Sequence, residues 1–244
     1  MRRYRFFISS PVDKDKFFIK DKEFHHLKNV LRLKQGDIVY GITEDFKQYV
    51  GKIEKIEDDK AICKYDVLGL RTQDPGLRTL SVMQSIIKEK KMSLIMEKAP
   101  ELNVDTVIPL ISKRSSWPLN TDKNKKILRW QNIIESGIKQ CGNLCPTRVE
   151  DILDIKNIDK FDFSKYDEIL LLSPLCRESG ITVSRRHGVT NLLVIIGPEG
   201  GFTEEEEELF VSKGARPILC SNNILRSETA FFYIASVLDY LLLK

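Results

Sequence analysis

Two short runs of apolar residues constrain the fold of this chain more than any other feature. Glu168–Leu172 and Asn191–Ile196 are apolar at nearly every position. A strand with one wet face alternates apolar and polar residues, so a continuous run indicates a strand covered on both faces of a parallel sheet. Segments with helical periodicity alternate with these and other short strands. The sequence therefore predicts an α/β domain with an open sheet.

The same patterns predict the other elements of this domain. We expect further strands at Arg78–Gln84, Thr106–Ile111 and Arg216–Leu219. The expected helices are one with Met92, Ile95, Met96, Ala99 and Leu102 on one face, ended or kinked early by Pro100; one opened by Asn120 or Thr121, with Ile127, Trp130, Ile134 and Ile138 on one stripe; Thr203–Gly214; and Ser227–Leu243, capped by Ser227.

The beginning of the chain has a different pattern. We predict a small β-rich domain over residues 1–72 and the α/β domain over residues 73–244, joined by the Pro-Gly-containing linker Gly69–Leu77. The elements predicted in the first domain are strands at Tyr4–Ile8 and Lys16–Ile19; a helix over Glu23–Leu33, capped by Asp21, with Phe24, Leu27, Val30 and Leu31 on one face; a turn at Gly36-Asp37; and strands at Asp37–Ile42, Tyr49–Ile56 and Ala61–Leu68.

The composition is that of an ordinary globular protein, with 42% apolar and 30% charged residues among 244. No apolar run approaches the roughly 18–20 residues that span a bilayer, and the start lacks the about 7–15 apolar residues of a secretory signal. We therefore expect a cytoplasmic protein, no membrane contact and five reduced cysteines. Cys141 and Cys145 have no matching second pair, so we expect no metal site.

The charges are unevenly distributed along the chain. Residues 1–35 and 71–148 are basic, and residues 36–70 and 149–244 are acidic, within a net charge of +4. Basic blocks suit a polyanion such as RNA, because each neutralised phosphate releases counterions. A lysine-rich, solvated surface explains the same pattern, so charge alone does not decide between the two.

The segment most informative about function is Gly197–Thr203 (GPEGGFT), which directly follows a predicted strand. Ligands of open α/β sheets bind beyond the carboxyl ends of strands, and glycines let a ligand approach the backbone. Thr203 and Glu206 have the spacing of a capping box. Glu204–Glu208 then place carboxylates where a phosphate would bind, and the segment matches neither a P-loop nor G-x-G-x-x-G. The pattern favours a neutral or positive ligand, such as adenosine joined to a methionine sulfonium; a plain tight turn is the alternative.

A second segment, Leu219–Ala230 (LCSNNILRSETA), also follows a short strand and opens a helix. Ile224 and Leu225 are apolar, while Arg226 and Glu228 flank Ser227. Such a loop suits the wall of an adenine pocket. Taken alone, an ordinary helix cap with a surface Arg–Glu pair explains it at least as well.

These two segments, in this order, resemble the paired C-terminal motifs of the RsmE family. Its members are SPOUT-class methyltransferases that modify N3 of a uridine in 16S ribosomal RNA. Apart from residues 150–190, nearly the whole chain shares the resemblance. The further matches are His26-Leu27, Val30–Leu33, Gly36-Asp37, Lys88, Glu97–Ala99, Glu101-Leu102, Ile108–Ile111, Arg114-Ser115, Arg129-Trp130 and Gln140.

The resemblance implies an N-terminal PUA-like β-barrel, a C-terminal α/β domain with a trefoil knot, and a homodimer that acts on 16S ribosomal RNA in the small ribosomal subunit. It implies S-adenosylmethionine as the methyl donor. The residues expected to bind this cofactor are Leu172, Ser173, Ile196, Gly197, Pro198, Glu199, Gly200, Gly201, Leu219, Cys220, Ile224, Leu225 and Arg226.

Methylation at uridine N3 places demands on the site. N3 carries a proton and is a poor nucleophile until that proton leaves, so a base is needed, or a cation that stabilises negative charge on the ring. We predict Arg226 as the cation, with Glu199 or Glu228 taking the proton or orienting Arg226. We expect nine basic residues to contact RNA phosphates: Arg2, Arg3, Arg5, Arg32, Lys34, Lys88, Lys90, Lys91 and Arg114. For each of them the alternative is an ordinary solvated side chain.

The chain departs from the family pattern in a few places. Cys220–Asn223 stands where Leu-Gly-x-Arg is usual, Asn143 replaces an Arg, and Asn103 replaces a Gly. We expect Ser221, in place of glycine, to push the backbone away from the cofactor. Two other functions fit the same fold: a non-catalytic RNA-binding or ribosome-assembly factor, and a SPOUT methyltransferase that acts on tRNA. The acidic helix start argues against a nucleotide-dependent enzyme.

Overall fold

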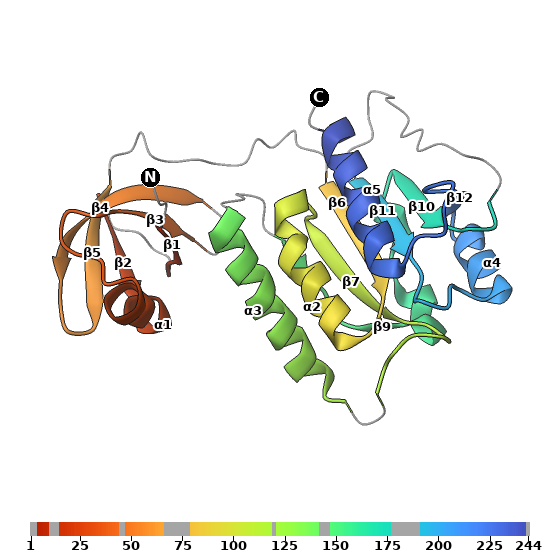
Figure 1. The fold of residues 1–244 in the computed structure, drawn as a ribbon, viewed down its shortest axis with the longest axis horizontal. Coiled ribbons are helices and arrows are strands. Elements are labelled where there is room, and N and C mark those ends of the chain that lie inside the picture. The colour runs from red at the N-terminus through yellow and green to blue at the C-terminus, as the bar shows by residue number, and fades with distance from the viewer. Residues whose placement is uncertain are drawn as a thin grey trace. The chain divides into compact units, whose positions relative to one another are not determined.

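Figure 1 shows the fold as a computed structural model, which describes residues 4–9, 15–43, 47–65, 79–118, 121–141, 147–176 and 191–242. The chain forms two compact units, residues 1–75 with 139–144 and residues 76–138 with 145–244. Several predictions fall outside the described residues: the linker Gly69–Leu77, the boundary between residues 72 and 73, Arg2, Arg3, Asn120 and Asn143.

The first unit is a five-stranded sheet in the order β1-β3-β4-β5-β2. Its strands are β1 (Tyr4–Phe7), β2 (Lys16–Lys20), β3 (Ile38–Ile42), β4 (Gln48–Ile56) and β5 (Lys60–Tyr65). β1 and β3 run parallel, and the other pairs are antiparallel. Alternate side chains such as Phe17 and Ile19 point into one buried core. The predicted strands are confirmed, except that residues 66–68 at the end of the last one lie outside the described residues.

The helical segment of this unit differs from the prediction. Helix α1 (Asp21–His25) begins at Asp21, which makes no side-chain cap and has a φ of 52°, so the predicted cap is wrong. The chain then continues as a π-helical turn over His26–Val30, in which the N–H of Leu31 donates to the carbonyl of His26. The wider turn changes the periodicity. Val30 is therefore 60% exposed and does not share the buried face of the helix as predicted.

The second unit is built on a parallel sheet in the order β12-β10-β11-β6-β7-β8, with β9 also paired to β7. Every residue of β10 and β11 after the first is buried, so these strands are covered on both faces as predicted. β8 and β9 were not predicted, because two residues carry no periodic signal. The strands are β6 (Thr79–Ser85), β7 (Thr106–Ile111), β8 (Arg148–Val149), β9 (Leu153–Asp154), β10 (Glu168–Leu172), β11 (Asn191–Ile196) and β12 (Arg216–Ile218).

Helices cover both faces of this sheet. α2 and α5 pack against each other on one face (Figure 1). On the other face, Phe210 of α4 joins a buried cluster with Leu171 and Ile195. The helices are α2 (Glu89–Lys98), α3 (Lys123–Cys141), α4 (Glu204–Ser212) and α5 (Ser227–Leu242), with 3-10 turns at Pro100–Leu102, Ile155–Lys160 and Phe163–Lys165.

The ends of these helices test the predicted signals. α2 stops at Lys98 and Pro100 begins a 3-10 turn, as expected of proline. α3 begins at Lys123, and the carboxylate of Asp122 accepts a hydrogen bond from the N–H of Lys125 at 3.2 Å. The predicted start at Asn120 or Thr121 is therefore wrong. The predicted Thr203 cap of α4 is confirmed.

Candidate active site

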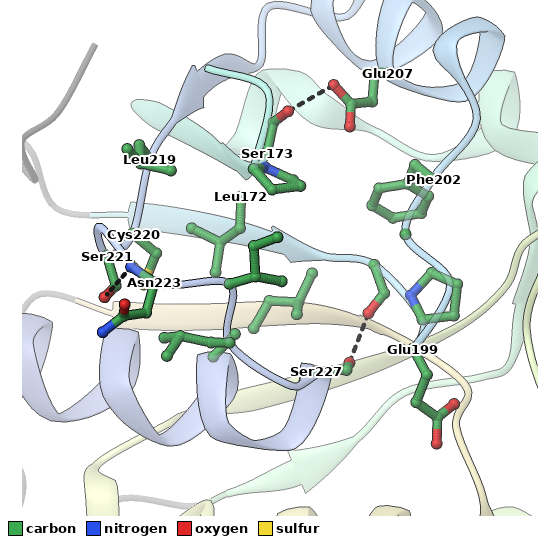
Figure 2. Close-up of a pocket in the computed structure, with 18 of the residues that line it drawn as sticks. Leu172, Ser173, Glu199, Phe202, Glu207, Leu219, Cys220, Ser221, Asn223 and Ser227 are labelled. Carbon is green, nitrogen blue, oxygen red and sulfur yellow. Dashed lines mark hydrogen bonds between the residues drawn. The ribbon is translucent and has the colours of Figure 1, made fainter. Parts of the chain in front are cut away.

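A pocket opens beyond the carboxyl ends of β10, β11 and β12, where open α/β sheets bind their ligands (Figure 2). Its cavity of about 250 Å³ is slightly smaller than the roughly 300–1,000 Å³ typical of small-molecule sites. The lining residues are Leu172, Ser173, Pro174, Ile196, Gly197, Pro198, Glu199, Gly201, Phe202, Glu207, Leu219, Cys220, Ser221, Asn222, Asn223, Ile224, Leu225, Ser227 and Ala230.

The structure brings together most of the residues that the sequence predicts for the cofactor. All of them line this one pocket except Gly200 and Arg226. The sequence did not predict eight lining residues as cofactor contacts: Pro174, Phe202, Glu207, Ser221, Asn222, Asn223, and Ser227 and Ala230 in the first turn of α5. The position of Ser227 and Ala230 could have been predicted from the sequence, because residues three apart in a helix lie on the same face.

The glycine turn is fixed by hydrogen bonds from three directions. The hydroxyl of Ser227 donates to the carbonyl of Gly197 at 2.6 Å (Figure 2). The guanidinium of Arg114 donates to the carbonyl of Gly200 at 2.8 Å. At the helix start, the N–H of Glu206 donates to Thr203 Oγ1, and Glu206 accepts from the N–H of Thr203. The turn is therefore held before any ligand arrives.

Ser227 is itself part of a buried chain of hydrogen bonds. The amide of Gln84, at the end of β6, donates to the Ser227 hydroxyl at 2.9 Å. Gln84 is fully buried and Ser227 is nearly so. Ser227 was predicted to cap α5, whereas it is the first residue of that helix and its hydroxyl serves the glycine turn.

The Leu219–Arg226 loop forms another wall. The N–H of Asn223 donates to the hydroxyl of Ser221 at 3.2 Å, and both residues line the pocket (Figure 2). Ile224 is 88% exposed although it also lines the pocket. Burial raises the pKa of Cys220 to about 11, so its side chain is a neutral thiol at pH 7. The loop thus offers a ligand both the apolar side chains of Leu219, Ile224 and Leu225 and the polar ones of Ser221, Asn222 and Asn223.

The charged residues of the pocket wall are acidic. Glu199 and Glu207 line it, and among the described lining residues there is no Lys, Arg or His. Glu207 accepts a hydrogen bond from the hydroxyl of Ser173 at 2.8 Å (Figure 2). Such a wall repels phosphate and suits a ligand with positive charge.

A lysine and two carboxylates meet at the edge of this pocket. Lys91 Nζ lies 3.3 Å from Glu199 Oε1 and 3.1 Å from Glu228 Oε1. The Glu228 hydrogen bond is the main cause that raises the pKa of Lys91. Burial acts to raise the pKa of Glu228, but its own backbone N–H, Lys91 and the charge of Arg226 together lower it. Lys91 was predicted to contact RNA phosphate, and its partners here are the two predicted catalytic carboxylates.

Arg226 lies directly after the loop and before α5. Its side chain is exposed, and it does not line the pocket. Its carbonyl accepts a hydrogen bond from the N–H of Ala230, and its charge acts on Glu228. Arg226 therefore lies close enough to Glu228 for their charges to interact but outside the cavity, and its catalytic role stays a prediction.

The other predicted RNA contacts have varied surroundings. The Arg5 guanidinium donates to the carbonyl of Lys139 at 2.9 Å and lies over the ring of Tyr40. The Arg114 guanidinium donates a hydrogen bond to the carbonyl of Gly200 in the glycine turn. Five of the predicted contacts are exposed in the structure, as an RNA contact requires: Arg32, Lys34, Lys88, Lys90 and Arg114.

The described part of the chain contains neither a metal-binding cluster nor a membrane-spanning helix. Among these residues, no group of three or more His, Cys, Asp or Glu side chains is arranged to hold a metal ion. No helix within the same ranges is both long and apolar enough to cross a membrane.

Comparison with known proteins gives the family. Residues 75–239 match the RNA methyltransferase domain, and residues 19–64 match the RNA methyltransferase PUA domain. The chain belongs to this RNA methyltransferase family. The first unit is accordingly PUA-like, and the second is the methyltransferase domain. The knot implied by the resemblance stays a prediction, because residues 177–190 lie outside the described residues.

Individual relatives of this RNA methyltransferase cover almost its whole length. Ribosomal RNA small subunit methyltransferase E of Bacillus subtilis is 28% identical over 231 residues, which are 92% of this chain and 90% of that protein. The solved structure of the enzyme of the same name from Neisseria gonorrhoeae, bound to S-adenosylmethionine, has 25% identity and a TM-score of 0.82 and covers 98% of both chains. A putative methyltransferase from Legionella pneumophila, also with this cofactor bound, has 25% identity and a TM-score of 0.83, covering 99% of this chain and 98% of that one. The predicted RsmE resemblance and fold class are confirmed.

Proposed function

We propose that this RNA methyltransferase transfers a methyl group from S-adenosylmethionine to N3 of a uridine in 16S ribosomal RNA. The observation that carries the proposal is the pocket, which lies between the two motif segments and has acidic but no basic side chains among its described lining residues. The names of the relatives support a small-subunit ribosomal RNA substrate. We also expect the enzyme to act in the cytoplasm, where ribosomes assemble.

The residues of the pocket fit this cofactor. The apolar side chains of Leu172, Leu219 and Leu225 offer surfaces for an adenine ring. The carboxylate of Glu207 offers negative charge to the cationic groups of the cofactor, while Glu199 is paired with Lys91 at the pocket edge. Ser173 keeps Glu207 oriented by its hydrogen bond. A nucleoside triphosphate would find the same carboxylates repulsive.

When bound, S-adenosylmethionine supplies a methyl group that is activated by the positive sulfur. The protein must hold the uracil in line with that methyl group and remove the N3 proton. Glu199 stands at the pocket edge, and in Figure 2 its side chain leaves the turn away from Leu219 and Cys220. We assign to this carboxylate the role of the base that takes the proton from uracil N3. Arg226, exposed beside the same edge, is assigned to the negative charge that develops on the uracil ring.

The RNA must present an unstacked base to this edge. Lys88 and Lys90, exposed at the start of α2 near Lys91, are suited to the phosphates that flank the target. On the PUA-like unit, Arg32 and Lys34 are exposed cations of the same kind. Because both units carry exposed cations, we expect binding that weakens steeply with added salt.

We also propose that the enzyme is a homodimer, as the resemblance implies. Large apolar side chains on α5 support a contact with another chain, since Tyr233 is 44% and Tyr240 is 61% exposed. Light scattering of the purified protein at several concentrations tests this directly. A mass of one chain at all concentrations would contradict it.

The decisive test of the function uses small ribosomal subunits that lack the modification. We expect labelled methyl groups from S-adenosylmethionine to enter 16S ribosomal RNA. Mass spectrometry of the digested RNA should then identify the product as a uridine methylated at N3. Transfer to tRNA with no transfer to subunits would favour the tRNA alternative. Binding to subunits with no transfer to any RNA would favour a non-catalytic assembly factor.

A further inference from the structure

We propose that Lys91 is a positioning residue for methyl transfer, which joins Glu228 to Glu199 and so fixes the carboxylate that faces the RNA base. This inference rests on the proposed function and refines it. It divides the two predicted carboxylates into different roles, with Glu199 toward the substrate and Glu228 as the anchor.

The contacts of Lys91 connect three separate elements. Lys91 is in the first turns of α2, Glu199 is in the turn that follows β11, and Glu228 is in the first turn of α5. The ammonium lies 3.3 Å from one carboxylate and 3.1 Å from the other. Two carboxylates close to the same point repel each other, and a cation between them removes that repulsion. Lys91 therefore holds Glu199 against a fixed partner on a helix.

The two carboxylates differ in how far a substrate can reach them. The side chain of Glu199 is 29% exposed and lines the pocket. The side chain of Glu228 is only 13% exposed and is not part of the pocket wall. Glu228 Oε1 bonds to Lys91, and Oε2 is buried with no hydrogen-bond partner among the described residues. A group that takes a proton from an RNA base must be within reach of that base, so this role falls to Glu199.

Lys91 acts through its charge. The hydrogen bond with Glu228 raises the pKa of Lys91, so the ammonium keeps its proton at neutral pH and cannot serve as a base. Glu228 is partly buried, and the Lys91 ammonium is one of the groups that lower the pKa of this carboxyl and so favour its charged form. The groups that act on Glu228 are its own backbone N–H, Lys91 of α2 and Arg226, with Glu199 on the other side of Lys91.

The same helix contains a matched control. Lys98, at the end of α2, also joins two carboxylates, with Nζ 3.0 Å from Glu97 and 2.8 Å from Glu101. Its partners do not line the pocket. Lys91→Met and Lys98→Met remove the same charge and the same type of contact from one helix, and only the first affects the site.

The experiment measures kcat, the KM of RNA and the pH profile of kcat for Lys91→Met, Lys91→Arg and Lys98→Met. For Lys91→Met we expect kcat to fall about tenfold or more, since misplacement of a catalytic group by about 1 Å can cost about 100-fold. We expect the KM of RNA to change less than about threefold. Lys91→Arg should recover most of kcat, and Lys98→Met should match the parent.

The pH profile gives a readout that a loss of folding would not produce. Without Lys91 the pKa of Glu228 rises, because burial then acts with one cation fewer to oppose it. Glu228 then keeps its proton to higher pH, so the acidic limb of the kcat profile moves to higher pH. Lys98→Met should leave this limb in place. The inference would be overturned if Lys91→Met changed neither kcat nor the acidic limb of its pH profile. It would also be overturned if this variant raised only the KM of RNA.

A double-mutant cycle keeps the test valid if Lys91→Met is partly unfolded. We expect Glu199→Gln to lower kcat about 100-fold or more, Glu228→Gln to have a smaller effect, and Lys91→Met to add less than about threefold in the Glu199→Gln background. A larger loss in Glu228→Gln than in Glu199→Gln would overturn the division of roles. The parent enzyme measured in parallel separates the two proposals: an inactive parent contradicts the function, whereas an active parent with independent effects contradicts only the role of Lys91.

Discussion

The Gly197–Gly201 turn and the Leu219–Arg226 loop are two walls of one pocket, and they are held in different ways. Ser227 and Arg114 donate hydrogen bonds to carbonyls of the turn, and a capping box fixes its end. The described contacts of the loop include a local bond between Asn223 and Ser221, and Ile224 is largely exposed. The comparison teaches that the turn is a preformed platform and the loop an adjustable wall. The loop is also where the sequence departs from the family at Cys220–Asn223.

The largest effect is expected at the end of the loop, where the cation lies. Arg226→Ala should lower kcat by roughly 100-fold or more, because it removes the positive charge assigned to the developing negative charge on uracil. S-adenosylmethionine binding should change less than about threefold, because Arg226 does not line the pocket. Arg148→Ala is the matched control, because it removes an exposed arginine at the start of β8. Turnover of Arg226→Ala within about threefold of the parent, a barrier change of under ~1 kcal/mol, would contradict the role.

The second effect compares Ser227, the first residue of α5, whose hydroxyl holds the glycine turn, with Ser221 of the loop. Ser227→Ala removes the hydroxyl that joins the buried Gln84 amide to the Gly197 carbonyl. We expect the free energy of unfolding to fall by about 1–3 kcal/mol, because buried polar groups lose their partner. Ser221→Ala removes a bond to the N–H of Asn223 within the loop, and should have an effect of less than about 0.5 kcal/mol. Urea unfolding measures both, and equal losses would remove the distinction between platform and adjustable wall.

A smaller difference in stability is expected between alanine substitutions at two neighbouring glycines of the turn. Gly201 has a φ of 68°, which is unfavourable for residues with a Cβ atom, although no atom crowds that position. Gly201→Ala should therefore destabilise the fold by about 1 kcal/mol. At Gly200 an added Cβ would lie 3.4 Å from Arg114 Cδ, an ordinary contact, so Gly200→Ala should change little. Thermal unfolding of the two variants measures the difference, and a larger loss at Gly200 would mean that packing, not backbone strain, limits the turn.

The smallest effect is expected where the loop departs from the family. The sequence predicts that Ser221 pushes the backbone away from the cofactor, and the structure places Ser221 on the pocket wall. Because this wall can adjust, Ser221→Gly should alter the Kd of S-adenosylmethionine less than about threefold. Calorimetric titration checks this. Binding that becomes more than about tenfold tighter would show that the serine does displace the ligand.

Local signals predicted much of the fold. The continuous apolar runs of β10 and β11 identified the covered strands, and Thr203 with Glu206 identified the start of α4. These signals depend on residues that are close in the sequence. The π-helical turn after α1 was not predicted, because the sequence pattern of Phe24, Leu27 and Val30 is the same for an ordinary helix. Its periodicity is set by the i+5 hydrogen bond.

The candidate site was predicted in part. Its two motif segments are visible as sequence, and most of their residues do line one pocket. The partners of Lys91 were not predictable from spacing, because Glu199 and Glu228 lie more than a hundred residues further along the chain. The same holds for the chain from Gln84 through Ser227 to Gly197. Such contacts depend on how helices and strands pack, which no local pattern records.

The measurement that tests the central claim most directly is a calorimetric titration of the purified, full-length protein with S-adenosylmethionine, repeated in the presence of an equal concentration of ATP. The acidic wall formed by Glu199 and Glu207 predicts binding of the sulfonium nucleoside that ATP does not weaken. Displacement by ATP, or no binding of S-adenosylmethionine at all, would contradict a pocket selective for a positively charged ligand.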